Sequence, residues 1–361
     1  MKKTGLLALV LLWLALCIAH WVLPSQEISE SERRKLEQFP KVSVKAIFSG
    51  DWMEDFESYT LDQFPLRDTF RRMKALVHYN LLGQKDNNGI YIADGYAAKL
   101  EYPLNENSLN NALTKFQKLY DKYLTGSQVY FSVVPDKGYF LAQPNGYPSL
   151  DYQALMDQVA AGLPWAEFVD VSGGLTLESY YKTDTHWRQE EILDVAQKLC
   201  EALGTGAFTE DDLTPETLER PFYGVYYGQA ALPMEAEQMT VLHHEILQNC
   251  TVYNHENGKT TGIYDWSKVE SQDLYDVFLS GAAALLTIEN PAGTPGKELI
   301  VFRDSYGSSL IPLLVKDYAR VTVIDTRYVA PQLLEKLVEF KGQDVLMLYS
   351  TLLLNSSFSL K

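Results

Sequence analysis

The order of hydrophobic and polar positions predicts a chain of alternating strands and helices. Continuous apolar runs bounded by turn residues are typical of strands buried on both faces, whereas apolar residues at three- and four-residue steps predict helices. The predicted strands are 129–134, 168–171, 299–302, 321–324 and 345–349. The predicted helices are 50–82 with a break at Pro65, 107–124 with Ser108 as N-cap, 151–162, 188–203, 306–318 and 331–340.

The alternation of strand and helix after residue 299 predicts a parallel sheet that is covered on both faces, which is the pattern of an α/β protein. Between 87 and 95, the turn signals Asn88-Gly89 and Asp94-Gly95 flank a short apolar run, which predicts a hairpin. Residues 204–297 are rich in Gly, Tyr, Thr and Asn and lack a long period. They are interpreted as an irregular insertion.

The start of the chain differs from the rest. Lys2 and Lys3 precede an uncharged run from Gly5 to Leu23, which is close to the ~20 residues that a helix needs to cross a bilayer. A basic start followed by an apolar core is typical of an export signal. No small-x-small cleavage site is obvious, so we favour an uncleaved membrane anchor over a cleaved signal that would release a secreted protein. The lysine pair places the remaining chain outside the cytoplasm.

These patterns divide the chain into three regions. Residues 1–24 are the signal-anchor or signal peptide, 25–49 are a polar linker, and 50–361 are the α/β domain with its insertion at about 204–297.

Composition excludes several classes of protein. The net charge of −16 argues against nucleic acid or anionic lipid as a partner for the surface as a whole. Cys17, Cys200 and Cys250 form no CxxC pair, which excludes a zinc ribbon, a thioredoxin motif and a disulfide scaffold. Cys200 and Cys250 could pair in an oxidising compartment or remain buried thiols. His243-His244-Glu245 lacks the HExxH pattern, so no metal site is predicted.

The first candidate for chemistry is the segment from Arg303 to Ser309, between a predicted strand and a predicted helix. At the carboxyl end of a parallel strand, Ser305 would lie beside free backbone N–H groups and the positive end of the helix dipole. Those features suit a nucleophile with an oxyanion hole, in which the Ser305 N–H would take part. Equally, a serine at this position can simply cap the helix.

The second candidate is Thr183-Asp184-Thr185-His186-Trp187. A serine nucleophile needs a base, and a histidine base needs an acceptor that fixes its tautomer. Ser305 as nucleophile, His186 as general acid and base, and Asp184 as the group that orients His186 supply all three roles. If they act together, the Ser305 oxygen should lie about 2.6–3.2 Å from a His186 ring nitrogen.

With these motifs in place, the chain resembles the SGNH-hydrolase-like proteins of the alginate O-acetylation family, AlgX and AlgJ. It resembles even more the related DHHW proteins of Gram-positive bacteria. The matching segments are Asp62–Asp68, Asn88–Tyr91, Val134–Lys137, Asp184–Trp187, Arg303–Tyr306 and Asp325–Tyr328. DHHW proteins usually carry His where Thr185 stands, and the threonine is similar to the alginate branch instead.

The resemblance implies a three-layer α/β/α sandwich with a mostly parallel sheet and permuted motif order, since the Asp–His segment precedes the serine. It also implies O-acetyl transfer onto an extracellular or cell-wall polysaccharide through an acetyl-serine. The acetyl group would come from a partner, a multi-pass membrane O-acyltransferase. No coenzyme A site is recognisable and no cofactor is expected.

Further candidates for binding the substrate are Tyr306, Arg303, Lys137 and Trp187. Three functions remain open at this point. The protein is an acetyltransferase, or a carbohydrate acetylesterase with the same triad and water as acceptor, or a non-catalytic glycan-binding or assembly protein whose Ser305 only caps a helix.

Overall fold

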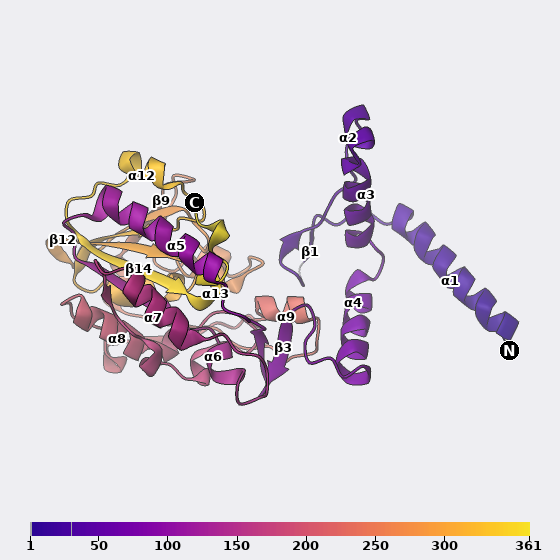
Figure 1. Cartoon of the computed structure of the whole chain (residues 1–361), viewed down its shortest axis with the longest axis horizontal. Helices are drawn as coiled ribbons and strands as arrows, with labels where there is room; N and C mark the ends of the chain where they lie inside the picture. The colour runs from indigo at the N-terminus through magenta and orange to yellow at the C-terminus, as the bar shows by residue number, and fades with distance from the viewer. Residues whose placement is uncertain (1, 30) are drawn as a thin grey trace. The chain divides into compact units, whose positions relative to one another are not determined.

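A computed structural model describes residues 2–29 and 31–361 (Figure 1). Its contacts group the chain into two units, Met1–Ile90 with Tyr227–Met234, and Tyr91–Tyr226 with Glu235–Lys361. Met1 and Glu30, which fall in the predicted anchor and linker, lie outside the described residues. The boundary between these units follows Ile90, whereas the sequence places the start of the α/β domain at residue 50, and that start stays a prediction.

The larger unit is built on an eight-stranded sheet with the order β10-β9-β11-β13-β12-β14-β5-β6. The strands from β13 to β6 are parallel, as the continuous apolar runs predict, and those from β13 to β10 are antiparallel. Their bounds are β5 (Val129–Val134), β6 (Glu167–Phe168), β9 (Thr251–Asn254), β10 (Thr260–Thr261), β11 (Leu285–Glu289), β12 (Thr294–Arg303), β13 (Tyr318–Ile324) and β14 (Asp344–Ser350). Strands β9, β10 and β11 lie in the predicted insertion, so that segment extends the sheet.

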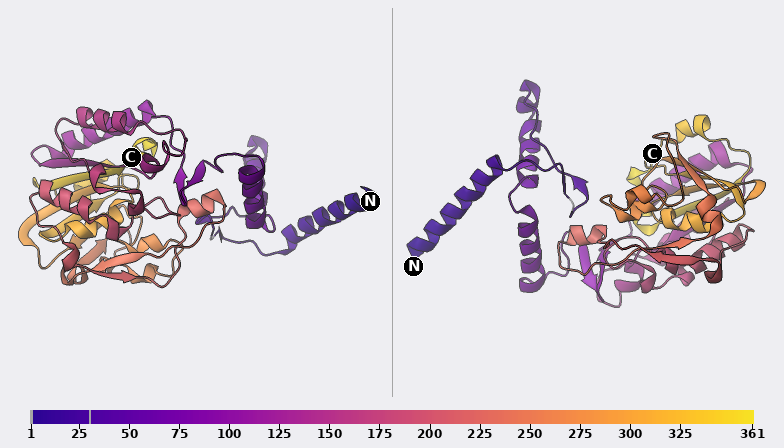
Figure 2. Two further views of the ribbon diagram at one scale, coloured as in Figure 1. Left: turned by 90° about the horizontal axis from the view of Figure 1, so that it is seen from below. Right: turned by 180° about the vertical axis from the view of Figure 1, so that it is seen from behind.

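Helices cover both faces of this sheet (Figure 2). Leu299 and Val301 of β12 pack in a core with α8 and α11, while Ile300 and Phe302 pack in a second core with α5 and α7. The helices of this unit are α5 (Glu106–Leu119), α6 (Gly138–Leu141), α7 (Tyr152–Gly162), α8 (Leu193–Ala202), α10 (Glu245–Asn249), α11 (Gly307–Leu314), α12 (Pro331–Leu337) and α13 (Thr351–Leu354). The predicted three-layer α/β/α sandwich is confirmed.

Short elements complete the chain. Two pairs of antiparallel strands are β3 (Ile90–Ala93) with β4 (Tyr96–Lys99), and β7 (Thr214–Thr217) with β8 (Thr240–His243). α9 is Val225–Ala230, and η2 (Tyr120–Leu124) continues α5 as a π-helix. The 3₁₀ turns are η3 (Ser172–Gly174), η4 (Leu177–Ser179), η5 (Gln189–Glu191), η6 (Glu210–Asp212), η7 (Trp266–Lys268), η8 (Leu274–Val277) and η9 (Ser357–Ser359).

The residues of the turn explain why β3 and β4 form a hairpin. Asp94 and Gly95 both have positive φ, 49° and 81°, which is the conformation of the tight turn that Asp-Gly favours. The predicted hairpin is therefore present.

The ends of two helices differ from those predicted, and at α5 the reason is that another side chain caps the helix. The N-cap of α5 is Asn105, whose side chain accepts the Ser108 N–H, and the Ser108 hydroxyl donates to the Leu354 carbonyl instead. The predicted helix 188–203 begins as α8 only after the 3₁₀ turn η5. Cys200 and Cys250 are buried free thiols.

The smaller unit is helical. It contains α1 (Lys2–Val22), the hairpin β1 (Ile28–Ser29) and β2 (Arg34–Lys35), α2 (Val44–Ser49), α3 (Asp51–Asp62), α4 (Arg67–Leu76) and the π-helix η1 (Val77–Leu81). By length and composition, Thr4–Val22 is apolar enough to cross a membrane, and none of it is buried. The predicted break at Pro65 separates α3 from α4. The segment predicted as a linker thus holds a hairpin and a helix.

Candidate active site

Ser305 lies in the turn that joins the carboxyl end of β12 to the start of α11. Asp304 fixes this turn, because its buried carboxylate accepts the Tyr306 N–H at 3.1 Å and the Ser350 N–H at the end of β14 at 2.8 Å. The N-cap of α11 is Tyr306, and no side chain caps the helix. The structure therefore does not support the capping role of Ser305.

The Ser305 hydroxyl instead meets His186. Its Oγ lies 2.7 Å from His186 Nε2, within the range expected from the sequence, and His186 Nδ1 lies 2.6 Å from Asp184 Oδ1. Because a carboxylate only accepts hydrogen bonds, Nδ1 carries the proton of the neutral ring, and Nε2 accepts from the serine. The three residues form one continuous chain of hydrogen bonds.

A reciprocal pair of hydrogen bonds, here called the clamp, holds the two segments together. Trp187 Nε1 donates to the Tyr306 carbonyl at 3.0 Å, and the Tyr306 hydroxyl donates to the Thr185 carbonyl at 2.6 Å. Burial raises the pKa of Tyr306 well above its usual value, so this phenol remains a donor. The clamp joins Thr185 and Trp187, on either side of His186, to Tyr306, which follows Ser305. It therefore sets the separation between His186 and Ser305.

Asp184 is fixed by a second segment that packs directly onto it. The Val225 N–H donates to Asp184 Oδ2 at 2.8 Å, and the Gly224 N–H donates to Thr183 Oγ1 at 2.8 Å. A Cβ on Gly224 would lie 2.2 Å from the Asp184 Cα, so only glycine permits this approach. Glu237 holds the preceding residues by accepting the N–H groups of Lys182 and Thr183.

Lys137 supports the same loop from inside the protein. Its ammonium donates to the carbonyl oxygens of Tyr181 at 2.8 Å and Lys182 at 3.3 Å, and its side chain is buried. Burial lowers the pKa of Lys137 to about 7, although the nearby carboxylates of Asp184 and Glu237 raise it. Lys137 therefore changes charge near neutral pH beside the Asp184 loop.

This burial makes a pH-dependent contribution to stability. Between pH 7 and 10.5, Lys137 is largely neutral in the folded state but protonated in the unfolded one. The unfolded state then binds more protons, so folding becomes more favourable as pH rises. We expect Lys137→Met to remove this pH dependence of the free energy of unfolding. The free energy of unfolding of wild type should therefore rise relative to that of the variant by about 1.4 kcal/mol per pH unit.

Urea unfolding of the full chain in detergent micelles from pH 7 to 10 measures this difference. Lys336→Met, at an exposed position of α12, serves as the control and should leave the slope of wild type unchanged. Parallel curves for wild type and Lys137→Met would contradict the assignment of the buried titration to Lys137.

The four residues predicted to bind substrate are all buried. Tyr306, Arg303, Lys137 and Trp187 are at most 2% exposed. Arg303 donates to the Ser308 hydroxyl and to the Gly281 carbonyl, and desolvation lowers its pKa. These side chains bond to protein groups beneath the surface, and their part in binding the substrate stays a prediction.

Tyr275 is a site residue that the sequence did not indicate. Its ring stacks on His186 with centroids 4.0 Å apart and planes 5° apart, and its hydroxyl bonds Ser309 Oγ at 2.8 Å. Tyr275 belongs to the irregular insertion, where no periodicity or motif marks it. Glu237 and Gly224 were missed for the same reason.

The environment of Ser305 also suits a developing negative charge. Among the residues that the structure describes, no acceptor is found for the Ser305 N–H, while the next N–H groups bond to Asp304 and Ser305. Ser305 is half-buried and His186 is only 7% exposed, so the pair is shielded but reachable. An activated hydroxyl beside a free N–H group can carry out acyl transfer.

The fold and this geometry define an α/β protein with a Ser–His–Asp arrangement in permuted order. Residues 176–324 match the family described as DHHW protein, a span that includes Asp184, His186 and Ser305. The resemblance to DHHW proteins predicted from the sequence is thereby confirmed. No match is found among curated proteins.

Solved structures share the fold. A DHHW family protein from Eubacterium siraeum is similar with a TM-score of 0.61 and 22% identity, covering 74% of this chain and 93% of that one. PatB1 of Bacillus cereus, solved with a sulfonyl adduct, has a TM-score of 0.55 and 16% identity, covering 73% and 95%. The O-acetyltransferase domain of Pseudomonas putida AlgJ has a TM-score of 0.46 and 15% identity, covering 75% and 95%.

Proposed function

We propose that the protein is an O-acetyltransferase that modifies an extracellular or cell-wall polysaccharide through an acetyl-serine intermediate. The observation that carries this proposal is the hydrogen-bond chain from Ser305 through His186 to Asp184, with separations of 2.7 and 2.6 Å. The DHHW match and the likeness in fold to PatB1, which has been solved with a sulfonyl adduct, are consistent with an activated nucleophile.

In the first half-reaction, Ser305 Oγ attacks the acetyl carbonyl carbon while its proton passes to His186 Nε2. The Ser305 N–H stabilises the oxyanion, and Asp184 stabilises the imidazolium. The bond to the donor then breaks, and His186 returns the proton to the leaving group. In the second half-reaction, a sugar hydroxyl attacks the acetyl carbonyl carbon while its proton passes to His186 Nε2. The bond between the acetyl group and Ser305 Oγ then breaks, and His186 returns the proton to Oγ.

The acceptor distinguishes a transferase from an esterase, since the same residues would serve water. We favour the sugar because the resemblance implies it, and the carbohydrate acetylesterase remains the other outcome of the experiment below. In the proposed setting, α1 anchors the chain in the membrane with the α/β unit outside. A multi-pass membrane O-acyltransferase supplies the acetyl group there.

The test uses purified full chain in detergent micelles with 4-nitrophenyl acetate as donor and a chito-oligosaccharide as acceptor. We expect nitrophenol release, an acetyl group on the peptide that contains Ser305, and acetylated oligosaccharide in the products. Release that is unaffected by the sugar, with acetate as the only product, would indicate an esterase.

A chemical probe gives an independent measurement. Phenylmethylsulfonyl fluoride should sulfonylate Ser305 alone, because sulfonylation requires a serine whose proton is accepted by a base. The adduct should be absent from His186→Ala but present in His255→Ala, which alters an exposed histidine outside the site. Absence of both the acetyl and sulfonyl adducts from wild type would overturn the enzymatic proposal.

A further inference from the structure

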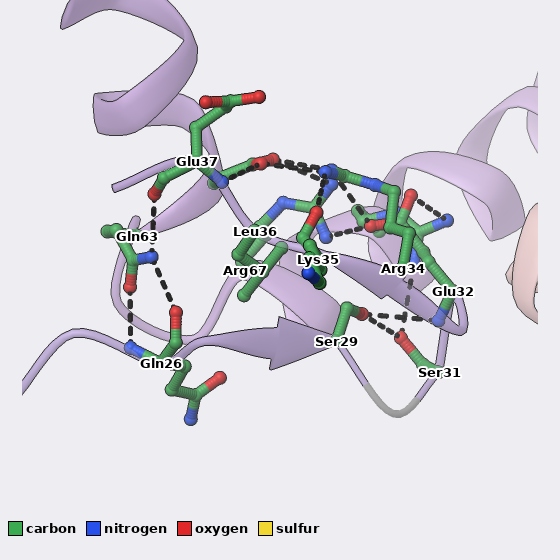
Figure 3. Close-up of polar contacts among 12 residues, drawn as sticks. Gln26, Ser29, Ser31, Glu32, Arg34, Lys35, Leu36, Glu37, Gln63 and Arg67 are labelled. Atoms are coloured by element: carbon green, nitrogen blue, oxygen red, sulfur yellow. Dashed lines mark hydrogen bonds and ion pairs between the residues drawn. The ribbon is translucent and has the colours of Figure 1, made fainter. Parts of the chain in front are cut away.

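The chain that leaves α1 is fixed next to the start of α4. His20 Nδ1, near the end of α1, donates to the Gln63 carbonyl at 3.3 Å. Gln26 and Gln63 exchange a reciprocal pair of hydrogen bonds at 2.9 and 2.8 Å (Figure 3). Gln63 lies four residues before Arg67, the first residue of α4. These hydrogen bonds therefore keep the start of α4 close to the end of α1.

Ion pairs connect the parts of this junction. Arg34 binds both carboxylate oxygens of Asp62, at 2.7 and 2.5 Å, and this contact lowers the pKa of Asp62. Glu32 binds Arg67 and Arg71 on the first turns of α4. The hairpin β1–β2 thereby joins the end of α3 to the start of α4.

One side of α4 and η1 exposes a line of apolar side chains, here called the α4 stripe. Its members recur at three- and four-residue steps, so they lie on one helix face. They are Leu66, Phe70, Met73, Val77 and Leu81, and their exposed fractions run from 41% to 77%. The opposite side contains Ala75, which is fully buried. A row of large exposed apolar residues next to a membrane-length helix indicates an interaction surface.

The charges beside the α4 stripe are mostly positive. Residues 67–81 contain four Lys or Arg and a single acidic residue, in a chain whose net charge is −16. A hollow of about 710 Å³ is lined by the cations Arg67, Arg71 and Lys74, by Glu32 and by apolar Phe64 and Phe70, so that three cations face one carboxylate. The neighbouring α3 is acidic by contrast. The occupant that fits α4 is therefore anionic at its head and apolar beyond it.

We propose that α4 and η1 lie on the outer surface of the bilayer, with the α4 stripe in the boundary between headgroups and acyl chains. In this arrangement Lys74 faces the phosphates of anionic lipids, while Arg67 and Arg71 also bind Glu32. This is the arrangement expected of a basic amphipathic helix. A second copy of the chain fits less well, because pairing two such helices would bring like charges together. The inference rests on the membrane anchoring of α1 in the proposed function, and not on the acetyl-transfer chemistry.

The test compares two exposed methionines on neighbouring helices of the full chain. Met73 lies on the α4 stripe and Met53 on acidic α3, with exposed fractions of 55% and 60%. Each is replaced in turn, Met73→Cys or Met53→Cys, and labelled with bimane. Cys200 and Cys250 are buried, so the new thiol is the most accessible target outside α1. The labelled chains are reconstituted into phosphatidylglycerol-containing vesicles with spin-labelled lipid.

We expect the bimane at position 73 to be quenched by lipid that is spin-labelled near the headgroup, and the bimane at position 53 to stay unquenched. Replacing the anionic lipid with phosphatidylcholine, or introducing Arg72→Glu with Lys74→Glu, should reduce quenching at position 73 at least about twofold while α1 keeps the chain in the vesicles.

Three outcomes would overturn the inference. Equal quenching at both positions would show no preference for the α4 stripe. Absence of quenching at position 73 would rule out the bilayer as the occupant, and disulfide-linked dimers of the unlabelled Met73→Cys chain under oxidation would then identify a second copy in its place. A chain that fails to float with vesicles would disprove the anchoring as well. Acetyl transfer in micelles is measured separately, so its failure is distinguishable from each of these.

Discussion

Ser305→Ala should lower turnover of 4-nitrophenyl acetate by about 10³-fold or more, and His186→Ala by a comparable factor. The reason is geometric: the Ser305 hydroxyl is hydrogen-bonded to His186 Nε2, so removing either partner removes the same proton transfer. The double variant should therefore be barely slower than either single variant. Steady-state rates of the four proteins, measured in micelles, give the coupling directly.

A measurement of stability distinguishes this loss of catalysis from misfolding. No side chain caps α11, so Ser305→Ala should leave the thermal midpoint close to that of wild type. Ser356→Ala, at an exposed serine, is the matched control and should keep full activity. If the losses of the two single variants multiply in the double variant, Ser305 and His186 act independently and the proposed triad is wrong.

The second large effect is expected from Gly224→Ala, outside the hydrogen-bond chain itself. The added Cβ would lie 2.2–2.3 Å from backbone and side-chain atoms of Asp184, which no Cβ contact tolerates. The segment must move away, and Asp184 then loses the bond from the Val225 N–H. We expect turnover to fall by at least about 100-fold through misorientation of His186, with a stability loss of about 1–3 kcal/mol.

Gly173→Ala is the matched control, since no atom lies within 4 Å of its added Cβ. Its activity and urea midpoint should equal those of wild type. Circular dichroism shows whether Gly224→Ala remains folded. Undiminished turnover in a folded Gly224→Ala protein would mean that the position of Asp184 does not govern the reaction.

Local pattern was enough to predict the parallel half of the sheet and to single out Ser305, His186 and Asp184 as candidates. The strands around 299–302 and 345–349 are uninterrupted apolar runs, and burial on both faces requires that composition. The Ser305 turn directly follows β12, as expected of a reactive group at the carboxyl end of a parallel strand. The Asp184–His186 segment lies in a loop between η4 and η5, so no local pattern predicted that it would meet Ser305.

What sequence did not predict depends on contacts between distant segments. Tyr275 stacks on His186, and β9 to β11 extend the sheet, yet both arise from a stretch without periodicity. Lys137 was expected at the substrate, but its ammonium bonds two carbonyls inside the protein. Only tertiary packing decides whether a polar side chain at a strand end points outward or inward.

The clamp between Trp187 and Tyr306 has a consequence for the order in which the protein matures. On the proposed route of export, the N-terminus stays inside and the residues next to α1 emerge first, so the segment with His186 is outside well before β12 delivers Ser305. The Ser305 turn is completed only when Ser350, at the end of β14, reaches Asp304. The nucleophile thus gains its base among the last steps of translocation, and a partly exported chain holds no reactive serine.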